Sequence, residues 1–344
     1  MENRNGLKRR EFLKLFGATG CAVALGGFPQ VPSSFAKEAF PSKKITWIVG
    51  HQPGGSNDVV ARGVSQYIEK YLRAISPSPD KVGMVVKNIV GGGQMRGLSA
   101  LYHAKPDGYT IGVGGDELQI GNVLGTLGFD LFKITFIARL TCNSKVLLTG
   151  GRSNLYTWDD IVKASKKAPL RIAIGNFGTA NHAAVIMFTD TTKLAAKPVF
   201  FGGTAGASAA LIRGDAPLGL NSLNDIRSLI DAKEIRPVLS FSEKSEYPGV
   251  PSVKDIGFPE LVEAIKSQKY VIAPPAMPAD IKKILQDLLK KTMEDEEFLA
   301  WSKKIGQPFE PIFGPELDKL VKEVLDFFKG KEKILKEYMT EKKS

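Results

Sequence analysis

The sequence predicts an α/β fold, with parallel sheets covered by helices and the chain divided between two domains. Short apolar runs alternate with longer segments of helical period almost throughout, which is typical of strands joined by crossover helices. The chain has 344 residues. About 300 of them remain after an N-terminal export segment is set aside, more than one hydrophobic core usually serves.

Each expected strand is an apolar run bounded by glycine, proline or polar residues, and each expected helix has apolar residues at a spacing of three and four. The expected strands are 45–49, 84–87, 110–114, 146–149, 171–175, 199–201, 217–220, 236–240 and 270–273. The expected helices are 58–74, 94–104, 116–125, 157–168, 180–192, 204–213, 222–232 and 278–292. From Pro315 onward, apolar residues at helical spacing predict one closing helix that packs on the first domain.

The N-terminal segment, residues 1–36, has the pattern of an export signal. Residues 8–14 (KRREFLK) match a twin-arginine signal, the apolar run at 15–28 is too short to span a bilayer, and Ser34-Phe35-Ala36 suits a signal peptidase. We therefore expect a soluble periplasmic protein. The alternative is lipid anchoring at Cys21, whose preceding residues resemble a lipoprotein site but lack its usual leucine.

Charge and cysteine content exclude two other classes of protein. Removal of residues 1–36 takes away five basic and two acidic residues, so the formal net charge falls from +11 to +8. The basic residues are scattered and have no interleaved aromatic residues, which argues against nucleic-acid binding. Only Cys142 would remain in the mature chain, so no disulfide framework is expected.

Three loops share one pattern, in which a strand ends, small residues follow, and a helix begins. They are residues 52–58, 176–182 and 202–206. Backbone N–H groups and the positive end of the helix dipole together make such a place a site for an anion. In the first loop, Ser56 or Asn57 is expected to cap the helix. The alternative for each loop is only a tight turn with a helix cap. No loop has the dinucleotide or Walker pattern.

The order and spacing of several short motifs resemble the periplasmic solute receptors of tripartite tricarboxylate transporters, the Bug or TctC-like family. The motifs are PGG at 53–55 with Asp58 and Ala61-Arg62, NIVGGG at 88–93, PDGYT at 106–110, FGTA at 177–180, FGGT at 201–204 with Gly214-Asp215, GVPSV at 249–253 with Gly257, and APP at 273–275. They cover nearly the whole mature chain.

This resemblance implies a type II, Venus-flytrap binding fold that closes on a small organic carboxylate and passes it to the membrane subunits of a secondary transporter. It implies lobes at 41–143 plus 268–344 and at 144–267, with no cofactor and a monomeric protein. The expected ligand-binding residues are His51, Pro53, Gly54, Gly55, Ser56, Asn57, Asp58, Phe177, Gly178, Thr179, Ala180, Asn181, His182, Gly203, Thr204 and Asn221.

Some of these residues have alternative interpretations. His51 replaces the aromatic residue usual in the family, and it either donates to a carboxylate or only hydrogen-bonds its own loop. Asp116 and Glu117 follow a strand end, and they cap the next helix, point away or meet an ammonium group. Asp58 and Arg62 are spaced for an intrahelical ion pair. Asn221 and Ser222 either reach the ligand or cap a helix. Cys142 is expected to be a small buried residue.

A different class of function is an exported hydrolase or lyase. In that hypothesis, His51 or His182 acts as the base and Asp116 or Glu117 as its partner. The sequence has no G-x-S-x-G or H-E-x-x-H segment. The three histidines have no further metal ligands at a suitable spacing, so no metal site is expected.

Overall fold

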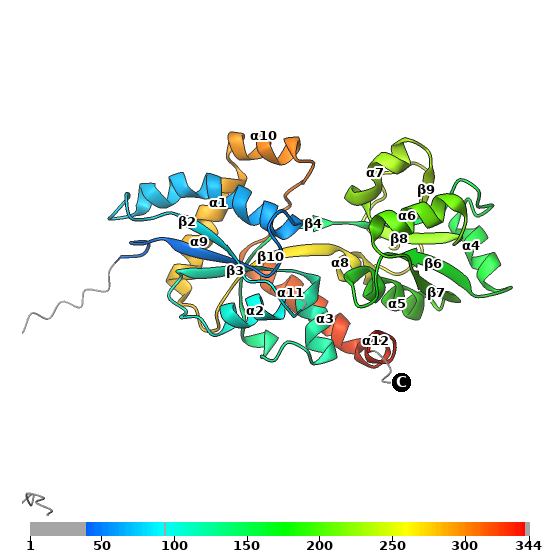
Figure 1. The fold of residues 1–344 in the computed structure, drawn as a ribbon, viewed down its shortest axis with the longest axis horizontal. Coiled ribbons are helices and arrows are strands. Elements are labelled where there is room, and N and C mark those ends of the chain that lie inside the picture. The colour runs from blue at the N-terminus through cyan, green and yellow to red at the C-terminus, as the bar shows by residue number, and fades with distance from the viewer. Residues whose placement is uncertain (1–38, 93, 341–344) are drawn as a thin grey trace, which may run out of the picture. The chain divides into compact units, whose positions relative to one another are not determined.

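The strands form two five-stranded sheets, each flanked by helices, in the computed structural model, which describes residues 39–92 and 94–340 (Figure 1). The first sheet has the order β2-β1-β3-β10-β4 and the second the order β7-β6-β8-β5-β9. The strands are β1 Ile45–Val49, β2 Met84–Asn88, β3 Thr110–Gly114, β4 Thr135–Asn143, β5 Lys145–Gly150, β6 Leu170–Ile174, β7 Ala196–Phe200, β8 Leu218–Ser222, β9 Ile235–Ser240 and β10 Ser267–Ala273.

Both sheets are mixed: the expected parallel pairs are present, and each sheet also has antiparallel pairs. In the first sheet β1 is parallel to β2 and β3, whereas β10 is antiparallel to β3 and β4. In the second sheet β6 is parallel to β7 and β8, whereas β5 is antiparallel to β8 and β9. The reason is that the chain changes sheet twice. Because β10 re-enters the first sheet where β3 ends, it runs against β3.

Helices follow most strands and bury their apolar faces on the sheets. They are α1 Ser56–Ile75, α2 Met95–Tyr102, α3 Asp116–Leu124, α4 Trp158–Ser165, α5 Ala180–Thr192, α6 Thr204–Arg213, α7 Leu223–Asp231, α8 Leu261–Ile265, α9 Ala279–Met293, α10 Glu296–Lys304, α11 Gly314–Gly330 and α12 Glu332–Met339, with the short 3₁₀ turn Leu131–Lys133. Helices α1 and α9 cover one face of the first sheet, where Trp47, Val64 and Leu288 are buried together.

Strand β4, helices α8 and α10 and the 3₁₀ turn Leu131–Lys133 were not predicted from the sequence, and the expected closing helix differs from the structure. Strand β4 is buried along almost its whole length and shows no alternation of apolar and polar residues. Helix α10 is short, and it follows the N-cap residue Asp295, whose side chain accepts from the N–H groups of Glu297 and Phe298. The expected single closing helix is two helices, which meet at Lys331.

The C-terminal helices do not pack on the first domain alone. Helix α11 contacts α3, β4 and α8, whereas α12 contacts α5 and α3. Leu335 and Met339 of α12 are buried in the same cluster as Val185 and Phe188 of α5. The reason is that the two apolar residues on α12 cover the exposed side of α5, a helix of the second sheet.

The predicted export signal lies outside the described residues. Within residues 39–92 and 94–340, no helix combines the length and the apolar character that a membrane crossing requires.

Candidate ligand-binding site

The first loop is held in shape by Asp58, which reaches back from α1. Asp58 is 2% exposed, and its carboxylate accepts from the Gly54 N–H at 2.8 Å, from Arg62 Nε at 2.9 Å and from Asn88 Nδ2 at 2.8 Å. The Arg62 hydrogen bond, with those from Gly54 and Asn88, lowers the pKa of Asp58 to about 2, against the effect of burial. The expected intrahelical pair with Arg62 is confirmed.

The same loop leaves backbone donors free at the start of α1. The residue that precedes the helix is Gly55, with an extended backbone and no side-chain cap, so the expected caps Ser56 and Asn57 are wrong. In the described part of the chain, the N–H groups of Ser56, Asn57 and Asp58 have no acceptor. The Asn57 side chain instead lies 3.0 Å from His51 Nδ1. Free N–H groups at a helix N-terminus are suited to an anion.

The second loop presents α5 in a similar way. Thr179 caps the helix, and its Oγ1 accepts weakly from the His182 N–H at 3.4 Å. His182 is 2% exposed, and its Nδ1 accepts from the Gly178 N–H at 3.2 Å. Burial lowers the pKa of His182 to about 4, so the ring is neutral at pH 7. The N–H groups of Thr179, Ala180 and Asn181 have no acceptor among the described residues.

In the third loop, the glycine N–H groups donate hydrogen bonds to the protein's own backbone. The N–H groups of Phe201, Gly202 and Gly203 all point at the carbonyl oxygen of Gly175, at 3.2, 2.9 and 3.2 Å. Gly202 and Gly203 have φ values of 70° and 107°, which glycine adopts without strain. This loop therefore anchors the start of the second loop, and the Gly203 amide is not free for a ligand. Thr204 begins α6 directly after it.

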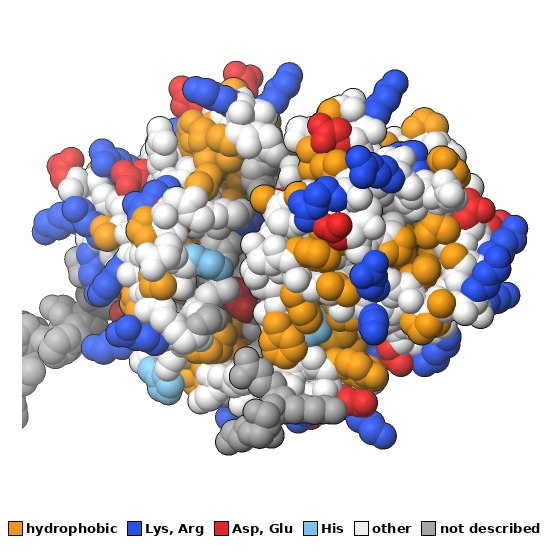
Figure 2. All heavy atoms as spheres, turned by 45° about the vertical axis from the view of Figure 1, so that its right-hand side comes forward, with side chains coloured by type: hydrophobic (Ala, Val, Ile, Leu, Met, Phe, Trp, Pro, Cys, Tyr) orange, Lys and Arg blue, Asp and Glu red, His pale blue; other side chains and the backbone are white. Residues whose placement is uncertain are grey.

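A cavity of about 520 Å³ lies between loops that follow strands of both sheets. Its walls include Gly92 and Gln94 after β2, Asp116 and Glu117 after β3, and Gly178–Ala180 after β6. Figure 2 shows the surface hollowed here, with acidic side chains in the depth of the hollow. Of the predicted site residues, the cavity wall includes Gly178, Thr179 and Ala180, and Phe177, a residue 41% exposed, lies next to them in the chain.

Two wall residues, Gln94 and Met95, were not among the predicted site residues. They follow β2 and a run of glycines, which is the same pattern of strand, glycines and helix that identified the other loops. Gln94 also lies against Gly50, which follows β1 and precedes the first loop, because a Cβ added at Gly50 would meet the Gln94 Cβ at 2.8 Å. The run NIVGGG at 88–93, directly before Gln94, is therefore the sequence signal that points to these two residues.

Asp116 and Glu117 are the first two residues of α3, after Gly115, and neither is the N-cap residue. The Asp116 carboxylate accepts from the Gln268 N–H at 3.1 Å, so it points toward β10. Burial raises the pKa of Glu117 to about 7, and the Asp116 charge adds to this, while the amides of Glu117 and Gly115 and the charge of Lys269 oppose it. Glu117 Oε1 is buried without a hydrogen-bond partner.

The acid–base pairs required by a hydrolase or lyase are not formed. His51 Nδ1 lies against Asn57 and His182 Nδ1 against Gly178, and neither histidine is hydrogen-bonded to Asp116 or Glu117 in the described residues. Burial, and then the charge of Lys269, lower the pKa of His51. The described residues also hold no group of three or more side chains arranged to bind a metal ion.

Asn221 does not sit in a loop as expected, because β8 extends to Ser222. It is 1% exposed, and its Oδ1 accepts from Asn181 Nδ2 at 3.2 Å. Asn221 therefore fixes the orientation of a second-loop residue. Ser222 occupies the N-cap position of α7 without a capping hydrogen bond.

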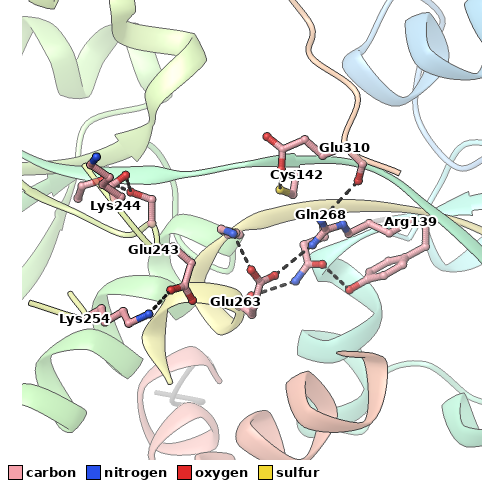
Figure 3. Close-up of polar contacts among 12 residues, drawn as sticks. Arg139, Cys142, Glu243, Lys244, Lys254, Glu263, Gln268 and Glu310 are labelled. Carbon is pink, nitrogen blue, oxygen red and sulfur yellow. Dashed lines mark hydrogen bonds and ion pairs between the residues drawn. The ribbon is translucent and has the colours of Figure 1, made fainter. Parts of the chain in front are cut away.

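The strands that connect the two sheets carry a polar network (Figure 3). Arg139 of β4 donates to Glu263 of α8 at 3.1 Å and to the Glu310 carbonyl at 3.4 Å. Cys142 Sγ donates to Glu310 at 3.0 Å, and the thiol is buried as expected, which raises its pKa to about 12. Only Ser144 separates β4 from β5, and only Lys266 separates α8 from β10. The connection between the sheets is therefore short and hydrogen-bonded.

Two α/β lobes with helix N-termini beside a cavity between them are the architecture of a solute-binding protein. Residues 80–337 match the model of the tripartite tricarboxylate transporter family receptor, TctC. The chain belongs to this receptor family.

Known relatives agree with this assignment. BugT of Bordetella pertussis is 23% identical over 262 residues, which are 72% of this chain and 76% of BugT. A TctC solute-binding protein from Polaromonas has a TM-score of 0.74 at 20% identity, with 85% of this chain and 98% of that one covered.

Two further solved structures with this fold contain an acid. One is an R. palustris protein with adipate, with a TM-score of 0.64 at 20% identity and coverage of 86% of this chain and 98% of that one. The other is MatC of Rhodopseudomonas palustris with malate, with a TM-score of 0.61 at 19% identity and coverage of 88% and 100%.

Proposed function

We propose that this protein is a periplasmic receptor that captures a small organic carboxylate between its lobes and delivers it to the membrane subunits of a secondary transporter. The observation that carries the proposal is the free N–H groups at the starts of α1 and α5, which belong to different sheets. Both helix N-termini attract negative charge, so a carboxylate is the ligand that they suit. Adipate and malate in two relatives of this fold support the same ligand class.

The predicted binding residues take different roles in this proposal. The amides of Ser56, Asn57, Thr179 and Ala180 contact the acid. Asp58, His182, Gly203 and Asn221 hold the loops, because their polar groups are already hydrogen-bonded within the protein. Phe177, 41% exposed, is free to contact an apolar part of the ligand.

The protein acts as a monomer, makes no chemical change to the acid, and consists of lobes close to 41–143 plus 268–344 and 144–267. The sheet membership of the strands supports these boundaries, since β4 ends at Asn143 and β10 begins at Ser267. Among the described residues, neither His51 nor His182 is hydrogen-bonded to Asp116 or Glu117, which supports a receptor over a hydrolase or lyase.

A thermal-shift screen followed by calorimetry tests the proposal. The panel contains succinate, malate, adipate, citrate, glutamate and benzoate, with the neutral amides succinamide, malamide and adipamide as controls. We expect at least one acid to raise the melting temperature and to bind with micromolar or tighter affinity, while its amide does not. Mass spectrometry of the incubated acid should detect no product. A panel without a binding acid, or an acid that is turned over, would contradict the proposal.

A further inference from the structure

Lys269 differs from the other buried cations of the described chain in having no partner. Three basic side chains are buried there, namely Arg139 at 5% exposure, Lys145 at 1% and Lys269 at 8%. Arg139 has the Glu263 carboxylate and the Glu310 carbonyl, and Lys145 Nζ donates to Ser267 Oγ. The Lys269 ammonium makes no hydrogen bond or ion pair with any described residue, whereas the Lys269 backbone pairs with Thr141 of β4. Lys269 Nζ is not among the fully buried polar atoms without a partner, so the ammonium reaches accessible space at the end of a mostly buried residue.

Lys269 lies on β10 at the end of β3, next to the candidate site, because Tyr270 pairs with Gly114 and the Gln268 N–H donates to the Asp116 carboxylate of the cavity wall. Its own positive charge lowers the pKa of His51 in the first loop and that of Glu117 in the cavity wall. Burial lowers the pKa of Lys269, and the negative charges of Asp116, Asp225 and Glu117 oppose this effect. Lys269 therefore lies within electrostatic reach of the loops after β1 and β3 and of the start of α7.

The nearby acids do not neutralise Lys269 by direct contact. None of Asp116, Glu117 and Asp225 forms an ion pair with it, and the Asp116 carboxylate already accepts from the Gln268 N–H. Lys145 is a second positive charge near Lys269, and each makes it harder for the other to stay protonated. The Lys269 ammonium thus lacks an anionic partner, as do the N–H groups at the starts of α1 and α5.

We propose that Lys269 is a specificity-determining residue, whose ammonium pairs directly with a carboxylate of the bound acid and discriminates against neutral molecules of the same shape. This inference rests on the proposed function, because it requires an acid in the same cleft. In low-dielectric surroundings a charge-assisted hydrogen bond is stronger than a neutral one, whereas a neutral amide leaves the ammonium unpaired. Lys269 then adds discrimination by charge to the generic attraction of the loop amides.

Calorimetry on the full protein with adipate, malate and their diamides tests the inference with three variants. Lys269→Met removes the charge and keeps the length, Lys269→Arg keeps the charge, and Lys319→Met is the control. Lys319 lies on α11 with its side chain 76% exposed. This control therefore makes the same change in net charge at an exposed position. Circular dichroism and thermal melting establish that each variant is folded.

We expect Lys269→Met to weaken the binding of the acids by about tenfold or more. Lys269→Arg should retain most of the affinity, and Lys319→Met should leave it unchanged. Adipate and malate binding within about twofold of the unaltered protein in Lys269→Met would overturn the inference, as would equal losses in Lys269→Met and Lys269→Arg. If the unaltered protein binds no acid, the proposed function itself fails, and this inference falls with it.

Should Lys269→Met fail to fold, a crystal structure of the unaltered protein with adipate or malate decides the question. A carboxylate oxygen within about 3.2 Å of Lys269 Nζ supports the inference, and a carboxylate beyond direct hydrogen-bond distance of it overturns the inference.

Discussion

At the scale of single residues, Asp58 shapes the first loop without being free to touch the ligand. Its pKa of about 2 in the folded chain lies below the ordinary 3.8, so folding favours the ionised form. This contribution to stability is complete above about pH 4 and disappears as the pH falls toward 2. Asp58→Asn should therefore lower the free energy of unfolding at pH 7 by about 1–3 kcal/mol, and by less at pH 3.

Urea denaturation at both pH values measures this difference. Asp287→Asn is a matched control, because Asp287 also pairs with a residue four positions away, Lys283, but has a side chain 51% exposed. Exposed ion pairs of this kind contribute little to the free energy of unfolding. A loss at pH 7 no larger for Asp58→Asn than for Asp287→Asn would show that the tether to Gly54 and Asn88 contributes nothing.

Glu117 should give the opposite pH dependence. Burial raises its pKa in the folded chain to about 7 from the ordinary 4.5, so the folded chain keeps a proton that the unfolded chain has lost. Its contribution therefore falls as the pH rises from about 4.5 to 7. Glu117→Gln should remove this part of the pH dependence and stabilise the protein at pH 8 by about 1–3 kcal/mol. Equal slopes of stability against pH in both proteins would contradict this.

At the scale of elements, the start of α5 offers a way to remove one amide without disturbing a helix. Ala180 is the first residue of α5, and the residue before it has an extended backbone, so proline fits there while its N–H is lost. Ala180→Pro should weaken acid binding by about tenfold, or about 1.4 kcal/mol. Ala279→Pro makes the same change at the start of α9, outside the site, and should bind normally in calorimetry. Equal affinities in the two variants would exclude the α5 amide as a contact.

Helix α12 should stabilise the second sheet from outside it. Leu335 is 1% exposed and packs in the cluster that contains α5, whereas Tyr338 on the same helix is 51% exposed. Leu335→Ala should lower the free energy of unfolding by about 2–4 kcal/mol, because it leaves a cavity against α5. Tyr338→Ala should lower the free energy of unfolding much less. Urea denaturation compares the two, and similar losses would mean that the α12 interface is not well packed.

The elements also explain how far the sequence alone could lead. The strands that end in glycine-containing loops were predicted to within a few residues, because the change from period two to a helical period is local information. Strand β4 was missed because burial on both faces removes the alternation. The placement of α12 on α5, and the use of the Gly203 amide by Gly175, depend on contacts between distant segments. For the same reason the sequence identified loops with free amides but not Lys269.

At the scale of the whole molecule, the free amides at the starts of α1 and α5 belong to different lobes, so an acid that touches both sets should favour the state in which the lobes approach. A ligand shifts such an equilibrium only by its differential affinity for the two states. Small-angle X-ray scattering should therefore show a smaller radius of gyration with saturating adipate or malate, whichever binds in calorimetry. The Ala180→Pro variant, saturated to the same degree, should contract less, because the α5 side has lost a contact. Tight binding with an unchanged scattering curve would mean that the acid is held by one lobe alone and that recognition does not require closure.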